Sequence, residues 1–216
     1  MPLLIDLSHP LEDGQPVYPS DPEIRVQPHG SLAEQGYHIT RLSLSTHQGT
    51  HLDAPFHFFD DGPTIDQLPL EACYGPASLI DLAPGGELPP DAAITPALLE
   101  PHAAAFAPGA RVLYRTGWDR RFGTPAFFEH FPSLTREAAQ WIAQRRIALL
   151  GMDTPGPSQD WQAVHRTLLG PEARIVLLES LAHLDRLPPQ FTLAALGLKI
   201  RARDGSPVRA IAIVNP

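Results

Sequence analysis

The chain has 216 residues, 24 acidic against 16 basic side chains, and a formal net charge of −8 at pH 7. The acidic balance without a basic stripe excludes nucleic acid as an expected partner, and no apolar run reaches the roughly 20 residues of a membrane span. The single Cys73 excludes an internal disulfide and a cysteine-built zinc site, and the first residues lack the form of a signal peptide. We therefore expect a cytoplasmic enzyme or binding protein with one domain over residues 1–216, a length that can bury a substantial core.

Short β-type runs and helical stretches follow one another along the chain. Strands are expected at 3–7, 24–27, 39–46 and 77–82, a helix at 95–100, a strand at 111–115, a helix over about 134–146, a strand at 147–151, a helix at 162–169, and strands at 175–178, 193–202 and 208–214. This alternation predicts an α/β fold with mixed sheets and flanking helices, without fixing the strand order.

Local patterns add detail to three of these elements. Leu42 and Leu44 alternate with serines, which is the period of a half-buried strand. The apolar runs 112–114, 147–150 and 175–178 are continuous, as expected for strands covered on both faces. Ser133 is the expected N-cap of the helix at 134–146.

Histidines concentrate in residues 47–57, which hold three of the chain's ten. The potential ligands of this segment all occupy odd positions: His47, His51, Asp53 and His57. An extended chain would present them on one side but would span roughly 33 Å, too long for one site. Gly49 and Pro55 are the residues that allow and fix bends, so we expect a strand that runs out into a ligand-bearing loop.

Imidazole and carboxylate donors without thiolate suit zinc, manganese or iron(II). Three protein ligands leave an open position at which a water can bind and lose a proton near neutral pH. The segment therefore predicts a metal site. The alternative is a set of unconnected histidines, one buried and the others exposed on a loop.

Two further candidates lie far along the chain. His165 falls on the helix expected at 162–169, and Glu179 follows the apolar run 175–178. A buried carboxylate needs a partner, because an unpaired buried charge is costly. A metal ion and a salt bridge to Arg166, Arg174 or Arg186 explain Glu179 equally well from the sequence.

The segment His47-x-Gly-Thr-His51-x-Asp53-x-Pro55-x-His57 resembles the signature of the cyclase family of metal-dependent hydrolases. That family includes bacterial kynurenine formamidases (arylformamidases) and isatin hydrolases. Weaker matches to it extend over nearly the whole chain, at 6–10, 16–19, 58–62, 151–154, 187–193 and 205–210 and in the pair His165 and Glu179.

The resemblance implies a swivelling β/β/α fold, usually in homo-oligomers such as dimers or tetramers, with one or two metals, zinc or alternatively manganese. It implies that His47, His51 and Asp53 bind a first metal and that Asp53 bridges to a second, held also by His165 and Glu179. It further implies that His57 is the general acid/base and that Tyr18 lies against the substrate.

Together these features predict a metal-dependent hydrolase of a non-peptide amide C–N bond, with a small aromatic amide or lactam as substrate. The leading hypothesis is an arylformamidase that converts N-formylkynurenine to kynurenine and formate; an isatin hydrolase-like enzyme for cyclic amides or lactones is the alternative. His51-x-Asp53 with His165 also matches the 2-His-1-carboxylate triad of iron(II) oxygenases, although that leaves His47 and His57 unexplained. A non-catalytic metal- or ligand-binding protein is the third class.

Overall fold

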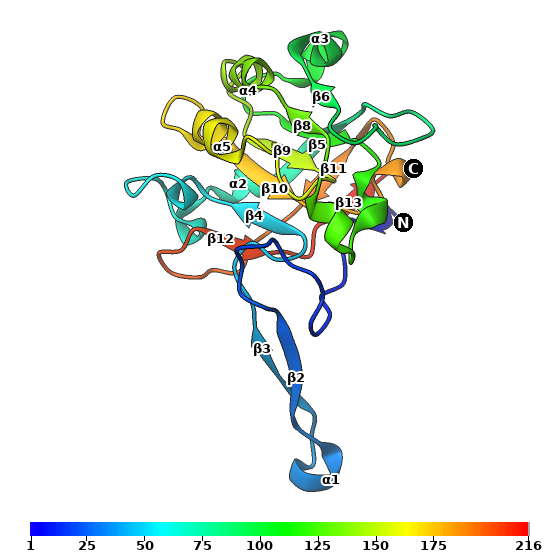
Figure 1. The fold of residues 1–216 in the computed structure, drawn as a ribbon, viewed down its shortest axis with the longest axis vertical. Coiled ribbons are helices and arrows are strands. Elements are labelled where there is room, and N and C mark those ends of the chain that lie inside the picture. Colours follow the sequence, from blue (N-terminus) through cyan, green and yellow to red (C-terminus); the bar gives the residue numbers. More distant parts are fainter. Residues whose placement is uncertain (216) are drawn as a thin grey trace.

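The computed structural model describes residues 1–215, and its largest feature is a curled sheet of nine strands (Figure 1). In spatial order the strands are β1 (Leu3–Asp6), β13 (Ile211–Val214), β11 (Gln190–Ala194), β5 (Tyr74–Asp81), β7 (Arg111–Arg115), β9 (Leu149–Met152), β10 (Val176–Glu179), β4 (His51–Asp53) and β12 (Gly205–Pro207). The four central strands β5, β7, β9 and β10 run parallel, and their outer neighbours pair antiparallel. The sheet is therefore mixed, as expected.

Both faces of the central strands are buried, which explains their continuous apolar runs. In β7, Val112 and Tyr114 enter one apolar cluster, while Leu113 between them enters a second cluster on the opposite face. In β10, Leu177 and Leu178 divide in the same way. A strand buried on both faces has no polar side to alternate with, and this accounts for the run.

Helices cover the face of the first cluster. The two longest, α4 (Arg136–Ala143) and α5 (Trp161–Leu169), pack against each other, and α3 (Pro96–Leu99) contacts α4. The remaining short elements are α2 (Leu70–Cys73), the pair β6 (Ala93–Ile94) and β8 (Ser133–Leu134), and 3₁₀ turns at Pro55–His57, Ile65–Gln67, Glu100–Ala105, Trp118–Arg121, Pro125–Phe128 and Leu184–Arg186. The predicted α/β class with flanking helices is confirmed.

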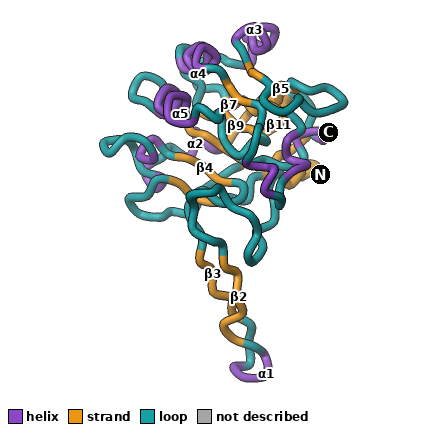
Figure 2. The backbone as a smooth tube through the Cα atoms, viewed as in Figure 1, coloured by secondary structure: helices purple, strands orange, loops and turns teal. Residues whose placement is uncertain are grey.

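A hairpin projects away from this body (Figures 1 and 2). It consists of β2 (Arg25–Gly30), the single turn α1 (Leu32–Gln35) and β3 (Ile39–Ser43), and we call residues 25–43 the β-arm. Every residue of β3 is exposed, including Leu42 at 60%. The strand expected at 39–46 ends at Ser43, and its prediction as half-buried is wrong over 39–43, where every residue is exposed; residues 44–46, beyond the strand, are half-buried.

Two further expectations need correction. The strand expected at 193–202 is found at Gln190–Ala194, and the chain leaves the sheet after Ala194 because its partner β5 begins at the paired residue Tyr74. The N-cap of α4 is Thr135, whose Oγ1 accepts a hydrogen bond from the amide of Ala138, whereas Ser133 lies in β8. Over residues 1–215, no helix has both the length and the apolar character that crossing a membrane would require.

Candidate active site and metal centre

The site is built on β4, a strand of only three residues enclosed between β10 and β12. His51 and Asp53 share one side of this strand, while Leu52 between them enters the second apolar cluster. The pairing of β4 with β10 sets His51 directly opposite Glu179. Two ligand types from distant parts of the sequence therefore meet on one face of the sheet.

The bends expected in the motif are present on both sides of β4. Gly49 has a φ of 66°, a left-handed conformation that glycine adopts without steric cost. Pro55 opens the 3₁₀ turn Pro55–His57, which brings His57 back over the strand. The segment is thereby shortened from an extended strip into part of one pocket wall.

Four buried side chains form a closed ring at the centre of the site. His51 Nε2 lies 3.3 Å from Asp53 Oδ1 and 3.4 Å from Glu179 Oε2. On the other side, Nε2 of His165, carried by α5, lies 3.6 Å from Asp53 Oδ2 and 3.4 Å from Glu179 Oε1. Glu179 thus faces two imidazoles rather than any of the arginines considered as its alternative partners.

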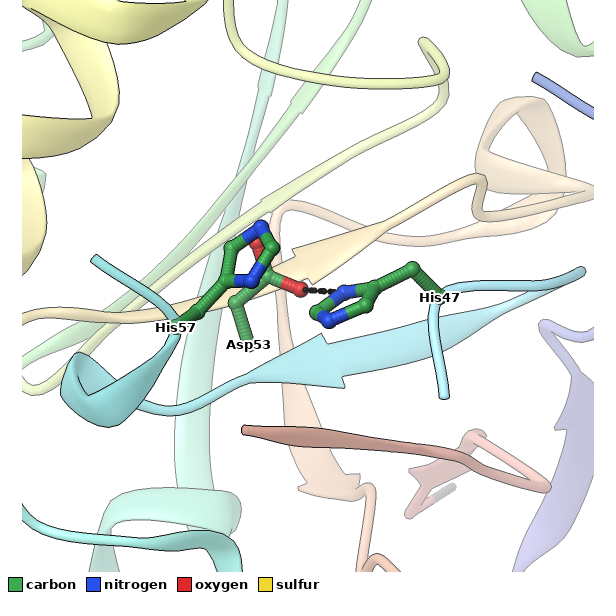
Figure 3. A group of neighbouring side chains, drawn as sticks. All are labelled: His47, Asp53 and His57. Atoms are coloured by element: carbon green, nitrogen blue, oxygen red, sulfur yellow. Dashed lines mark hydrogen bonds and ion pairs between the residues drawn. The ribbon is translucent and has the colours of Figure 1, made fainter. Parts of the chain in front are cut away.

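His47 and His57 lie beside this ring, next to Asp53 (Figure 3). His47 Nδ1 is 2.7 Å from Asp53 Oδ1, and the imidazole rings of His47 and His57 are 3.9 Å apart between centroids. The sequence-predicted residues His47, His51, Asp53, His57, His165 and Glu179 all line one cavity, and Tyr18 lines the same cavity.

The electrostatics of the cluster favour positive charge at its centre. Burial would raise the pKa of Asp53, but the neighbouring His47 and His51 hold that pKa well below its usual range. Burial opposes protonation of His51, yet the Asp53 and Glu179 carboxylates raise its pKa well above the ordinary value. Burial likewise opposes protonation of His47, while Asp53 and Asp204 raise its pKa to about 9.

His57 differs from the other imidazoles. Burial lowers its pKa and is the largest influence; attraction from Asp53 and Glu179 opposes it, while repulsion from His47 and His165 acts in the same direction as burial. A neutral imidazole at neutral pH can accept a proton, so this ring has the state that a general base needs.

The ring of four fits a divalent metal on two grounds. Two tetrahedral donors that each lie about 2.1 Å from a zinc ion are about 3.4 Å apart. The nitrogen–oxygen distances around the ring, 3.3–3.6 Å, are close to that value. Glu179 Oε1 is buried and accepts no hydrogen bond within residues 1–215, so one of its oxygen lone pairs is open to a cation. His51, Asp53 and Glu179 offer donor atoms within 4.8 Å of one another, and so do His47, Asp53 and His57. Asp53 belongs to both groups.

The cavity in front of the ring is about 590 Å³ and has a strongly aromatic wall. Tyr18, Phe58 and Trp161 line it, and four more aromatic side chains join them from the segment 122–131: Phe122, Phe127, Phe128 and Phe131. Arg166 is the only arginine or lysine that lines it among the described residues. A planar aromatic molecule is the ligand that such a wall favours.

Asp204 is the residue of this site that the sequence did not reveal. Its Oδ2 lies 2.6 Å from His47 Nε2, although 157 positions separate the two residues. The contact depends on the pairing of β12 with β4, and nothing in the local pattern announces that pairing. The acidic residue just before Gly205-Ser206-Pro207 was the only available signal.

Comparison with known proteins agrees with this arrangement. The family described as "Putative cyclase" matches residues 5–159. The chain belongs to the cyclase family. Kynurenine formamidases of Bordetella petrii and Geobacillus thermodenitrificans are each 33% identical to this chain. The first match covers 98% of this chain and 98% of the relative, and the second covers 95% of each. The structure of isatin hydrolase A from Labrenzia aggregata, bound to benzyl benzoate, superposes with a TM-score of 0.88 at 30% identity, over 100% of this chain and 94% of that one.

Proposed function

We propose that this cyclase-family protein is a metal-dependent hydrolase of a non-peptide amide C–N bond, with an N-aryl formamide, N-formylkynurenine, as its substrate. The observation that carries the proposal is the closed ring of His51, Asp53, His165 and Glu179 at the base of an aromatic cavity, with His57 beside it. The similarity to two kynurenine formamidases favours the formamide over other aryl amides.

In this proposal His51, Asp53, His165 and Glu179, with His47 next to Asp53, hold one or two metal ions, zinc first and manganese as the alternative. Such an ion, when bound, activates water and polarises a carbonyl oxygen. The donor set of imidazoles and carboxylates suits either metal. Metal analysis of the purified protein distinguishes the two.

The chain's own residues account for substrate orientation and proton transfer. Tyr18, Phe58 and Trp161 line the cavity together with Asp53; in this proposal the aryl ring packs against the three aromatic side chains and the formyl group is directed toward Asp53. The attacking water must lose a proton, and the neutral ring of His57 takes it. The same ring returns a proton to the aryl nitrogen as the C–N bond breaks, since an amine departs poorly as an anion.

A cyclic amide hydrolase is the second candidate, supported by the similarity to an isatin hydrolase structure. The same cavity and proton transfer serve ring opening, in which the released nitrogen stays attached to the product. The deciding experiment measures kcat/KM for N-formylkynurenine, formanilide and isatin on protein of known metal content. Preference for isatin would replace the first assignment by the second; no hydrolysis of any amide or lactone by metal-loaded protein would overturn both.

We also propose that the protein forms homo-oligomers through the β-arm. Four large apolar side chains of the arm are 45–62% exposed: Leu32, Tyr37, Ile39 and Leu42. A two-stranded hairpin is marginally stable alone in water, so a partner surface is expected to cover it. A second copy suits the charge, because the arm carries Arg25 and Arg41 against Glu34, whereas the chain as a whole is at −8.

A further inference from the structure

Asp204 stands at the point where the chain enters β12, the edge strand next to β4. Its backbone carbonyl accepts a hydrogen bond from the amide of Ala54, 2.8 Å away, just after the ligand-bearing strand ends. The side chain is 32% exposed. Asp204 is therefore fixed to β4 by its main chain while its carboxylate is directed at the motif.

The carboxylate meets the motif at His47. Asp204 Oδ2 lies 2.6 Å from His47 Nε2, and it also accepts a hydrogen bond from Thr46 Oγ1 at 2.9 Å. The other ring nitrogen of His47, Nδ1, lies 2.7 Å from Asp53 Oδ1 at the edge of the four-residue ring. The imidazole of His47 thus spans two carboxylates, one at the metal centre and one outside it.

The next residue, Gly205, lies against the same His47 ring. A Cβ at position 205 would come within 2.8 Å of His47 Cε1 and 2.6 Å of the Leu52 carbonyl oxygen. The absence of a side chain lets the imidazole lie directly on the backbone of β12. Gly205 thus leaves space for the His47 ring, and Asp204 contacts one of its nitrogens.

An ordinary surface ion pair does not explain these features. Exposed pairs have long mobile side chains and contribute little free energy. Here the acceptor is tied by Thr46 and by a backbone hydrogen bond, and the ring lies against Gly205, where an added Cβ would collide with it. Metal-binding histidines characteristically donate their second ring N–H to a carboxylate, which fixes the tautomer that leaves the other nitrogen free for the metal.

We propose that Asp204 is a positioning residue that accepts a hydrogen bond from His47 Nε2 and so turns Nδ1 toward Asp53 and the metal centre. The inference rests on the proposed metal-dependent function. Asp204 touches neither metal nor substrate in this arrangement and acts only through His47. His57 Nδ1 is 3.9 Å from the same Asp204 oxygen, so the carboxylate borders both motif histidines outside the ring of four.

The test compares Asp204→Asn and Asp204→Ala with Asp185→Asn as the matched control, because Asp185 is an exposed aspartate in the 3₁₀ turn Leu184–Arg186, outside β4 and β12. Zinc affinity is measured by competition with a chromophoric chelator, and apo-protein melting reports on folding. We expect affinity to fall 10- to 100-fold in Asp204→Ala and less in Asp204→Asn, whose amide oxygen still accepts a hydrogen bond, with the control unchanged. Native affinity in Asp204→Ala would overturn the proposal.

A second measurement follows the proton itself. A hydrogen-bonded imidazole N–H gives a downfield, slowly exchanging proton resonance, and we expect one from His47 Nε2 that disappears in Asp204→Ala and in His47→Gln but persists in Asp185→Asn. This signal is read on metal-free protein. If native protein binds neither zinc nor manganese yet shows an Asp204-dependent resonance, the proposed function fails, whereas the hydrogen bond by which Asp204 orients His47 stands. A resonance indifferent to Asp204 would contradict the positioning role itself.

Discussion

In the body of the protein, neighbouring side chains of one strand enter two different apolar clusters, whereas in the β-arm neither face of β3 meets a core. Leu113 of β7 is fully buried, while Leu42 of β3 is 60% exposed. Both segments have the apolar content of a strand. The central strands of the body bury their apolar side chains within the chain, whereas the arm exposes its own, and we expect a second copy to cover them.

The candidate active site lies wholly in the body, and the largest effect that we expect is a loss of kcat when His57 is replaced. Replacing His57 by Gln removes the proton acceptor beside the ring, and we expect kcat to fall about 10²–10⁴-fold while zinc content stays native. Steady-state kinetics on the best amide substrate and metal analysis check it. His130→Gln, a change at an exposed histidine bonded to Asp91, is the control. Native kcat in His57→Gln would remove His57 from the mechanism.

The next effect concerns the arm. Changing Leu32 and Leu42 to Glu places charges on a surface that we expect to be covered by a second copy. Losing two buried apolar contacts of about 1.5–3 kcal/mol each raises the oligomer dissociation constant at least about 100-fold. Light scattering coupled to size-exclusion chromatography measures the mass against the 23.6 kDa of one chain.

Leu98→Glu is the matched control for the arm, because Leu98 is an exposed apolar residue of the body. It should keep the native mass. If native protein has the mass of a single chain at micromolar concentration, a second copy does not cover the exposed apolar side chains of the arm, and the arm has another role.

The smallest effect is a pH dependence confined to the body. The ring of His9 stacks on Phe122 at 3.8 Å, and burial lowers the pKa of His9 to about 4. The unfolded chain, with a pKa near 6.5, binds more protons between pH 6.5 and pH 4, so stability falls as pH drops through that window. His9→Phe keeps the stack and removes the titration, and we expect it to abolish about 2 kcal/mol of that loss between pH 7 and pH 4.5.

Denaturant unfolding at several pH values measures this slope. An unaltered slope in His9→Phe would show that the buried ring does not govern acid sensitivity. The arm variants should keep the native slope, since His9 packs within the body.

The sequence allowed much of the body to be predicted. Continuous runs such as 112–114 identified the buried central strands, and the odd-numbered parity of His51 and Asp53 placed them on one side of a strand. The helix predicted at 162–169 is α5, which carries His165. These features are set by neighbours a few residues apart.

The features that escaped prediction depend on distant pairing. Strand β4 is three residues long and contains two polar residues, so its identity as a strand comes from β10 and β12 rather than from its own composition. Asp204 reaches His47 only through that pairing. At the end of the arm, Leu42 and Leu44 alternate with serines as in a half-buried strand, yet Leu42 is exposed, because local sequence does not show whether another surface covers a strand.

The confinement of β4 between β10 and β12 also sets an order of events during synthesis. Its residues leave the ribosome more than a hundred positions before either neighbouring strand, since Asp53 pairs with Leu177 and with Gly205. Until those late segments have been made, the histidine motif is a short, unpaired stretch, and His165 and Glu179, half of the ring of four, are missing. The four donors of the ring therefore come together only when almost the whole chain has been made. We expect a metal ion to bind late in folding and to stabilise a nearly complete fold rather than to nucleate it.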